Sequence, residues 1–225
     1  NRQTGRNFSG VIRDTAWAVF QEGYQEGYGA DGDHLKSIQE VKDALNAGVS
    51  MVTLDLSEKL NPRAFTDPKE RIRRRFNEEI DKDDAKVFLH LFLKKEFLLK
   101  GHQGEFQIYF DEKCVKRNAL LFHQAIDFIE EVYQFILSQT KNRAAIDFEI
   151  SIDETPFYTS PESHLFFIIL LRHRGVHIDS LAPKFIGEFQ KAVDYRGDRE
   201  TFRRQFYQHV LIAKAVSYTH LRAHE

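Results

Sequence analysis

The stretch from Gly29 to His34 reads GADGDH and places two carboxylates and one imidazole within four positions. It is soon followed by Ser37–Glu40, a Ser-x-x-Glu capping box that predicts the start of a helix. We therefore expect GADGDH at the end of a strand, in the turn that leads to that helix. Titratable groups at such turns are where α/β proteins place their functional side chains.

The residues that follow predict a strand–helix–strand unit. The segment 38–47 has an apolar face at helical spacing and stops at Gly48, a residue that favours helix ends. Residues 49–56 read as a buried strand with Asp55 near its carboxyl end.

A second informative stretch is 145–153, where apolar and polar residues alternate with the period of a strand. On a surface strand this polar row would simply face solvent. In a barrel strand the apolar face meets the helices and the other face points into the lumen. That arrangement would bring Glu149 and Asp153 into a site, with Glu154 and Thr155 at the end of the strand.

The remaining elements alternate in a way that favours a parallel α/β fold. We expect a charge-dense helical segment in 61–95, interpreted as a solvated face, and a hairpin from 96–99 and 105–110. A long helix should begin near Asp111, a helix should cover 159–174, and a last helix should begin near Asp198. A strand is expected at 176–178 or at 184–186.

Polar residues at several strand ends favour a (β/α)8 TIM-type barrel over an open sheet. About four strands are expected, and a complete barrel needs about 250 residues. We therefore predict a partial barrel, interrupted by a helical and hairpin excursion over about 61–110.

Composition bounds the class of protein. The 225 residues are 42% hydrophobic, enough for one domain with a full core. A net charge of −2 gives no indication of a nucleic-acid partner, and the sequence shows no membrane-spanning run. The single cysteine, Cys114, is typical of a reducing compartment, so we expect a cytoplasmic protein. The oligomeric state is left open.

The last ten residues, VSYTHLRAHE from Val216 to Glu225, resemble the in-frame translation of a transposon-type sequencing adapter. The alternative is a natural polar tail. We expect a domain over 1–214, followed by a non-native segment over 215–225 that carries no information about the site.

The residues themselves suggest a metal-assisted acid/base site built from Asp31, Asp33, His34 and Glu149. Imidazole and carboxylate suit a divalent cation such as Zn²⁺, Mn²⁺ or Ni²⁺. Two carboxylates in different environments can act as base and acid. The alternative is that the GADGDH segment supplies only a cap and a hydrogen-bonded histidine.

Several long motifs resemble the bacterial tagaturonate/fructuronate epimerases, in the same order and at similar spacing. They are WAVFQEGY (17–24), GYGADGDH (27–34), DFEISIDET (147–155), KFIGE (184–188), Lys191 and DYRGD (194–198). The resemblance covers nearly all of 1–214 and is loose only over 60–100.

This resemblance implies a metal-dependent isomerase of hexuronate catabolism that acts on a small-molecule hexuronate. Asp33 would be the proton acceptor, His34 a metal ligand and Glu149 the proton donor. Lys191 would contact the substrate carboxylate, and Asp31, Asp153 and Glu188 are further candidate substrate-binding residues. Another metal-ligand histidine of the family lies in a Leu-His-Ser-Gly segment that this chain lacks, so we expect the fragment alone to be inactive.

The two sugars differ at a carbinol carbon that is beta to the ketone. We therefore expect reversible cleavage of a carbon–carbon bond and its re-formation on the other face, with a metal ion stabilising the negative charge. Asp33 would take the hydroxyl proton and Glu149 would return one.

Two other interpretations remain open. One is a related metal-dependent barrel, of the class II aldolase or sugar isomerase kind, acting on another acid sugar. The other is a non-catalytic binding domain derived from a barrel, in which Asp33, His34 and Glu149 need not converge.

Overall fold

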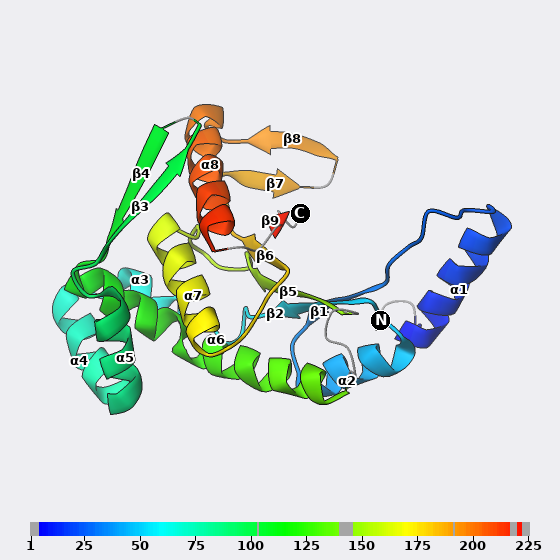
Figure 1. The fold of residues 1–225 in the computed structure, drawn as a ribbon, viewed down its shortest axis with the longest axis horizontal. Helices are drawn as coiled ribbons and strands as arrows, with labels where there is room; N and C mark the ends of the chain where they lie inside the picture. Colours follow the sequence, from blue (N-terminus) through cyan, green and yellow to red (C-terminus); the bar gives the residue numbers. More distant parts are fainter. Residues whose placement is uncertain (1–4, 103, 140–145, 191, 217–219, 222–225) are drawn as a thin grey trace.

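The computed structural model describes residues 5–102, 104–139, 146–190, 192–216 and 220–221. The chain forms a mixed α/β fold in which helices pack against a parallel sheet (Figure 1). The helices are α1 (Phe8–Gln21), α2 (Ile38–Ala47), α3 (Arg63–Thr66), α4 (Lys69–Glu79), α5 (Lys82–Phe92), α6 (Glu112–Gln139), α7 (Pro161–His173) and α8 (Arg199–Ala215). The strands are β1 (Asp31–Leu35), β2 (Met51–Asp55), β3 (Glu96–Gly101), β4 (Gly104–Tyr109), β5 (Asp147–Ile152), β6 (Ser180–Pro183), β7 (Glu188–Gln190), β8 (Val193–Arg196) and β9 (His220–Leu221).

The main sheet has the order β1-β2-β5-β6-β9, and all of its neighbouring strands are parallel. The α/β class is therefore confirmed. Within the described ranges the sheet is open, with β1 and β9 at its edges, so it does not form the closed wall of a barrel. The edge strand β9 lies inside the segment 215–225, whose non-native origin stays a prediction.

The local signals around α2 are confirmed. Ser37 accepts a hydrogen bond from the Glu40 amide, and the Glu40 carboxylate accepts one from the Lys36 amide at 2.8 Å. Gly48 ends the helix with a φ of +92°, a conformation that glycine adopts without steric cost. The hairpin β3–β4 and the long helix α6 also lie where the sequence predicts them.

Two predictions about strands are wrong. GADGDH was expected in the turn at the end of a strand, but its residues from Asp31 to His34 belong to strand β1 itself, which runs to Leu35. The strand after α7 is 180–183 rather than 176–178 or 184–186. Asp179 decides this position: its side chain accepts a hydrogen bond from the Phe148 amide and its own amide donates to the Phe148 carbonyl, so pairing with β5 begins at the next residue.

Helices cover the apolar face of the central strands, as expected for β5. The rings of Tyr133 on α6 and Phe148 on β5 lie 5.9 Å apart. On β1, a Cβ added to Gly32 would lie 3.0 Å from the Cβ of Ala44 on α2, so this glycine allows helix and strand to approach closely. The polar side chains of these strands therefore project from the opposite face.

The charge-dense segment is only partly a solvated face. Arg75 on α4 is buried and forms ion pairs with Asp67 at 2.7 Å and with Glu79 at 2.6 Å. The Arg75 hydrogen bond lowers the pKa of Glu79. The positive charge of Arg75 is thus already paired with two carboxylates, so this arginine is not available to bind a phosphate. No helix in the described part of the chain is long and apolar enough to cross a membrane.

A buried pair of histidines joins α7 to α8. Nδ1 of His164 and Nδ1 of His209 lie 2.7 Å apart, and their rings stack with centroids 4.9 Å apart. Both side chains are buried, and burial lowers the pKa of each, that of His209 to about 4. One ring must carry hydrogen on Nδ1 and the other must accept it, so the accepting ring is neutral, and burial favours the neutral form of both rings.

This pair predicts acid sensitivity. The pKa of His209 is lower in the folded chain than the ordinary 6.5, so the unfolded chain binds more protons between about pH 6.5 and pH 4. The free energy of unfolding should therefore fall as the pH falls through that window, by about 3 kcal/mol at its lower end. Urea unfolding at pH 7 and pH 4 should show this additional loss relative to a His209→Gln variant. Equal losses in the two proteins would contradict it.

Candidate metal centre and acid/base row

Strand β1 contains one residue more than the matching part of β2. Gly32 pairs with Val52 and Leu35 pairs with Leu54, so the register shifts between these two pairs. His34 lies in this irregular segment with a φ of +55°, which is uncommon for a non-glycine residue. A bulge of this kind redirects a side chain. The bulge explains how the His34 side chain reaches Asp55 on the neighbouring strand β2. The carboxylate of Asp33 lies on the other side of the ring, near Nε2.

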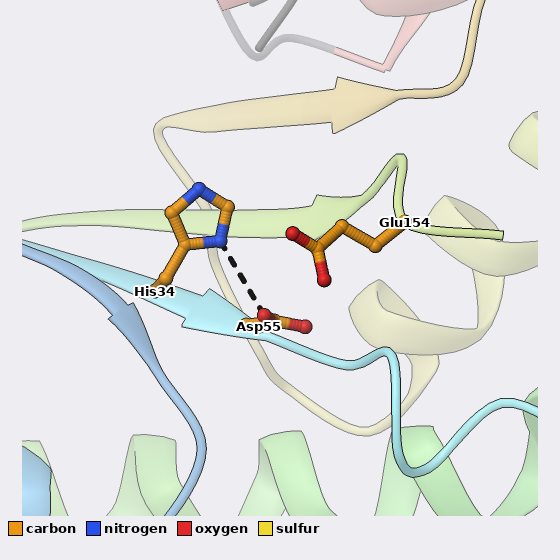
Figure 2. Close-up of side chains that lie close together, drawn as sticks. All are labelled: His34, Asp55 and Glu154. Atoms are coloured by element: carbon orange, nitrogen blue, oxygen red, sulfur yellow. Dashed lines mark hydrogen bonds and ion pairs between the residues drawn. The ribbon is translucent and has the colours of Figure 1, made fainter. Parts of the chain in front are cut away.

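His34, Asp55 and Glu154 come together at the carboxyl ends of β1, β2 and β5. One ligand atom from each lies within 4.8 Å of the others, and Figure 2 shows the Glu154 carboxylate directed towards the other two. Nδ1 of His34 lies 3.4 Å from Oδ2 of Asp55. Asp55 is buried, His34 is half-buried and Glu154 is exposed. The cluster is thus open on the side of Glu154.

Asp55 is held in its ionised form. Burial alone would raise its pKa, but hydrogen bonds from Ser57 and Lys36 outweigh burial and lower the pKa. The Ser57 amide donates to Oδ1 at 2.8 Å, and the Lys36 ammonium lies 3.3 Å from Oδ2. A carboxylate that is charged at neutral pH is ready to bind a cation, with Lys36 as its present counter-charge.

The donor set fits a divalent metal ion. An imidazole and two carboxylates are ligands of Zn²⁺ and of other first-row divalent ions. With metal–ligand bonds of about 2.1 Å, ligand atoms lie roughly 3–4 Å apart, so the observed 4.8 Å limit requires only a small inward movement. The exposed Glu154 is the side chain with room to move.

A second polar row crosses the sheet one step nearer the amino ends of the strands. Thr53 pairs with Glu149, and Glu149 pairs with Ser180. The Thr53 hydroxyl lies 3.0 Å from Oδ2 of Asp31 and 3.3 Å from Oε1 of Glu149, and the Ser180 hydroxyl donates to Oε2 of Glu149. Glu149 and Thr53 are fully buried, whereas Asp31 is half-buried.

The residues proposed from the sequence therefore divide into groups. Asp33 and His34 are neighbours at the cluster, and the Asp33 side chain is 58% exposed. Asp31 and Glu149 meet through Thr53 in the second row. Two other candidates have different surroundings: Asp153 accepts a hydrogen bond from Ser151, and Glu188 is exposed on β7. Lys191 lies outside the described residues, so its prediction stays untested.

Sequence reasoning did not assign Asp55, Glu154, Lys36 or Thr53 to the site. Two of them carried a usable signal, because Asp55 and Glu154 each stand at the carboxyl end of a strand. Carboxyl ends of adjacent parallel strands meet at one edge of a sheet. Thr53 carried no such signal, since a threonine inside a buried strand is ordinary β-sheet composition.

Functional groups at the carboxyl ends of parallel strands are typical of α/β proteins that bind small molecules at that edge of the sheet. The chain belongs to the tagaturonate epimerase family: the family model UxaE, described as tagaturonate epimerase, matches residues 1–224. The predicted resemblance is thereby confirmed.

Individual relatives agree. The tagaturonate/fructuronate epimerase of Thermotoga maritima is 38% identical over 214 residues, which are 95% of this chain and 42% of that protein. Crystal structures of the fructuronate-tagaturonate epimerase UxaE from Cohnella laeviribosi are also similar. The complex with one glycerol has a TM-score of 0.87 at 42% identity, and the match covers 97% of this chain and 43% of the Cohnella chain. The complex with two glycerols has a TM-score of 0.89 at 42% identity, with 98% and 44% covered. The chain thus spans less than half the length of these relatives.

Proposed function

We propose that this chain carries the acid/base and metal-binding face of an epimerase that interconverts D-tagaturonate and D-fructuronate. One observation carries the proposal. In a chain of this family, a His–Asp–Glu cluster and a buried glutamate both lie along the same parallel sheet. The single cysteine supports a cytoplasmic location.

His34, Asp55 and Glu154 would hold the divalent cation. A cation bound there supplies Lewis acidity that polarises a carbonyl group. Asp33 is suited to accept the hydroxyl proton, because its carboxylate is exposed and stands beside the ring of His34. Glu149 is the candidate for donating one, because its carboxyl group lies on the same polar face of the sheet and is held by the hydroxyls of Thr53 and Ser180. Acid and base of this kind serve reversible cleavage and re-formation of a carbon–carbon bond.

The remaining expectations belong to the same proposal. Lys191 would pair with the substrate carboxylate, with Asp153 and Glu188 as further substrate contacts. The strands β1, β2, β5 and β6 are adjacent in chain order without a reversal, which is the strand order of a (β/α)8 barrel. We propose that they are part of such a barrel and that this chain alone does not turn over substrate.

The test is an epimerase assay on a chimera in which residues 1–214 replace the matching segment of the Cohnella laeviribosi enzyme. Conversion of D-fructuronate to D-tagaturonate is expected, together with its loss on chelation and its return on adding Mn²⁺, Zn²⁺ or Ni²⁺. The parent enzyme is the positive control. A chimera that folds but shows no conversion, while its parent is active, contradicts the proposal. Turnover of a different acid sugar in its place would favour a related aldolase or isomerase.

Asp55 gives a prediction that needs no turnover. An Asp55→Asn variant of this chain should bind Mn²⁺ or Zn²⁺ at least about tenfold more weakly in calorimetric titration, because the buried negative ligand is lost while its shape is kept. Asp147→Asn, on an exposed carboxylate at the start of β5, is the matched control. Equal affinity in wild type and Asp55→Asn would remove Asp55 from the metal centre.

A further inference from the structure

Lys36 brings a positive charge to the carboxylate at the centre of the candidate metal cluster. Its ammonium lies 3.3 Å from Oδ2 of Asp55, and Nδ1 of His34 lies 3.4 Å from the same oxygen. The other oxygen of this carboxylate, Oδ1, accepts a hydrogen bond from the Ser57 amide at 2.8 Å. Oδ2 is therefore the oxygen that faces the cluster, and Lys36 is already bound to it.

Several acidic groups hold this ammonium in its charged form. Burial would lower the pKa of Lys36, but the hydrogen bond to Asp55 and the charges of nearby carboxylates outweigh burial and raise the pKa. These carboxylates are Asp55, Glu154 and Glu58. Two of them, Asp55 and Glu154, are also candidate ligands of the metal ion. The lysine thus offsets the negative charge that would attract a divalent cation.

A divalent cation and this ammonium cannot share Oδ2 of Asp55 at low cost, because like charges repel strongly in a partly buried site. Lys36 is the group that can give way. Its side chain is flexible and 37% exposed, whereas the Asp55 side chain is buried and is fixed by the Ser57 amide. Glu58, which is 72% exposed and lies 3.9 Å from the ammonium, offers the displaced lysine a partner at the surface.

We propose that Lys36 competes with the divalent cation for Oδ2 of Asp55 and gives way when the cation binds, an inference that rests on the proposed function. Lys36 is a positioning residue that acts through Asp55. In the metal-free chain it keeps the buried carboxylate paired and so stabilises the fold. In the presence of a cation it sets how tightly the cation is held, because its own bond to Asp55 must be broken first.

The two roles give Lys36→Met opposite effects on two measurements of this chain. Its affinity for Mn²⁺ in calorimetric titration should rise by about tenfold, because no charge-assisted hydrogen bond to Asp55 is lost on binding. The urea midpoint of the metal-free protein, recorded with a chelator, should fall, because the buried carboxylate loses its counter-charge. A residue with a merely structural role would lower stability without raising the affinity for the cation.

Three further variants sharpen the comparison. Lys36→Gln keeps a hydrogen-bond donor without the charge and should show the same gain in affinity, so the test does not depend on the folding of one variant. Lys36→Arg keeps the charge and should show no gain. Lys42→Met, on an exposed lysine of α2, is the matched control and should leave both measurements at the wild-type values.

The outcomes separate this inference from the proposed function. An affinity at or below the wild-type value in folded Lys36→Met and Lys36→Gln, beside the expected loss in Asp55→Asn, would overturn the inference alone. Binding of Mn²⁺ that neither Asp55→Asn nor Lys36→Met changes would place the cation elsewhere and overturn the metal centre, and the inference with it. The absence of Mn²⁺ binding in all of these proteins would do the same.

Discussion

Replacing Glu149 by glutamine in the chimera should lower kcat by about two to four orders of magnitude, the usual range for loss of a general acid. Glutamine has nearly the same shape, and its amide can still hydrogen-bond to the hydroxyls of Thr53 and Ser180. It cannot release a proton to a substrate oxygen. The fold should therefore persist while the proton-donating step fails.

The measurement is steady-state turnover of D-fructuronate, with unfolding curves recorded in parallel. Glu78→Gln is the matched control, because Glu78 on α4 is exposed and forms a surface ion pair with Arg74. It should leave kcat unchanged. A Glu149→Gln variant that folds and retains wild-type turnover would show that the proton comes from another group.

Replacing Phe166 by alanine should lower the free energy of unfolding of this chain by about 3–5 kcal/mol. Phe166 on α7 has an exposed fraction of 0%, and its ring lies 4.4 Å, between centroids, from that of Phe92 on α5. It also contacts the rings of Phe88, Phe110 and Phe122. Alanine would leave a cavity where the central helices meet, and these helices cannot all collapse into it.

Urea unfolding at neutral pH measures this loss. Phe20→Ala is the control, because Phe20 on α1 is 76% exposed and its removal should change stability by no more than about 0.5 kcal/mol. Similar losses for Phe166→Ala and Phe20→Ala would contradict the packing role of Phe166.

The helices show how far local signals extend. The capping box at Ser37 and the glycine at position 48 bound α2 by themselves, because both act through hydrogen bonds and dihedral angles within a few residues. Strand β6 shows the opposite case. Its position depends on Asp179 pairing with Phe148, 31 residues away in the chain, and no property of 176–186 alone records that contact.

The candidate site residues divide in the same way. The motifs indicated Asp33, His34 and Glu149, and the alternation along β5 correctly placed the apolar side chains against the helices. The sequence did not indicate Thr53 as the link between Asp31 and Glu149, since this depends on the register between three strands.

The sequence by itself determined the α/β class, the boundaries of its capped helices and the family to which the chain belongs. Those features are encoded in residues close together in the chain or in long matching motifs. The tertiary structure alone decided that His34 turns towards Asp55 and Glu154, and that Glu149 is buried beside Thr53. Both follow from how neighbouring strands pair, because one extra residue in β1 changes which side chains meet across the sheet.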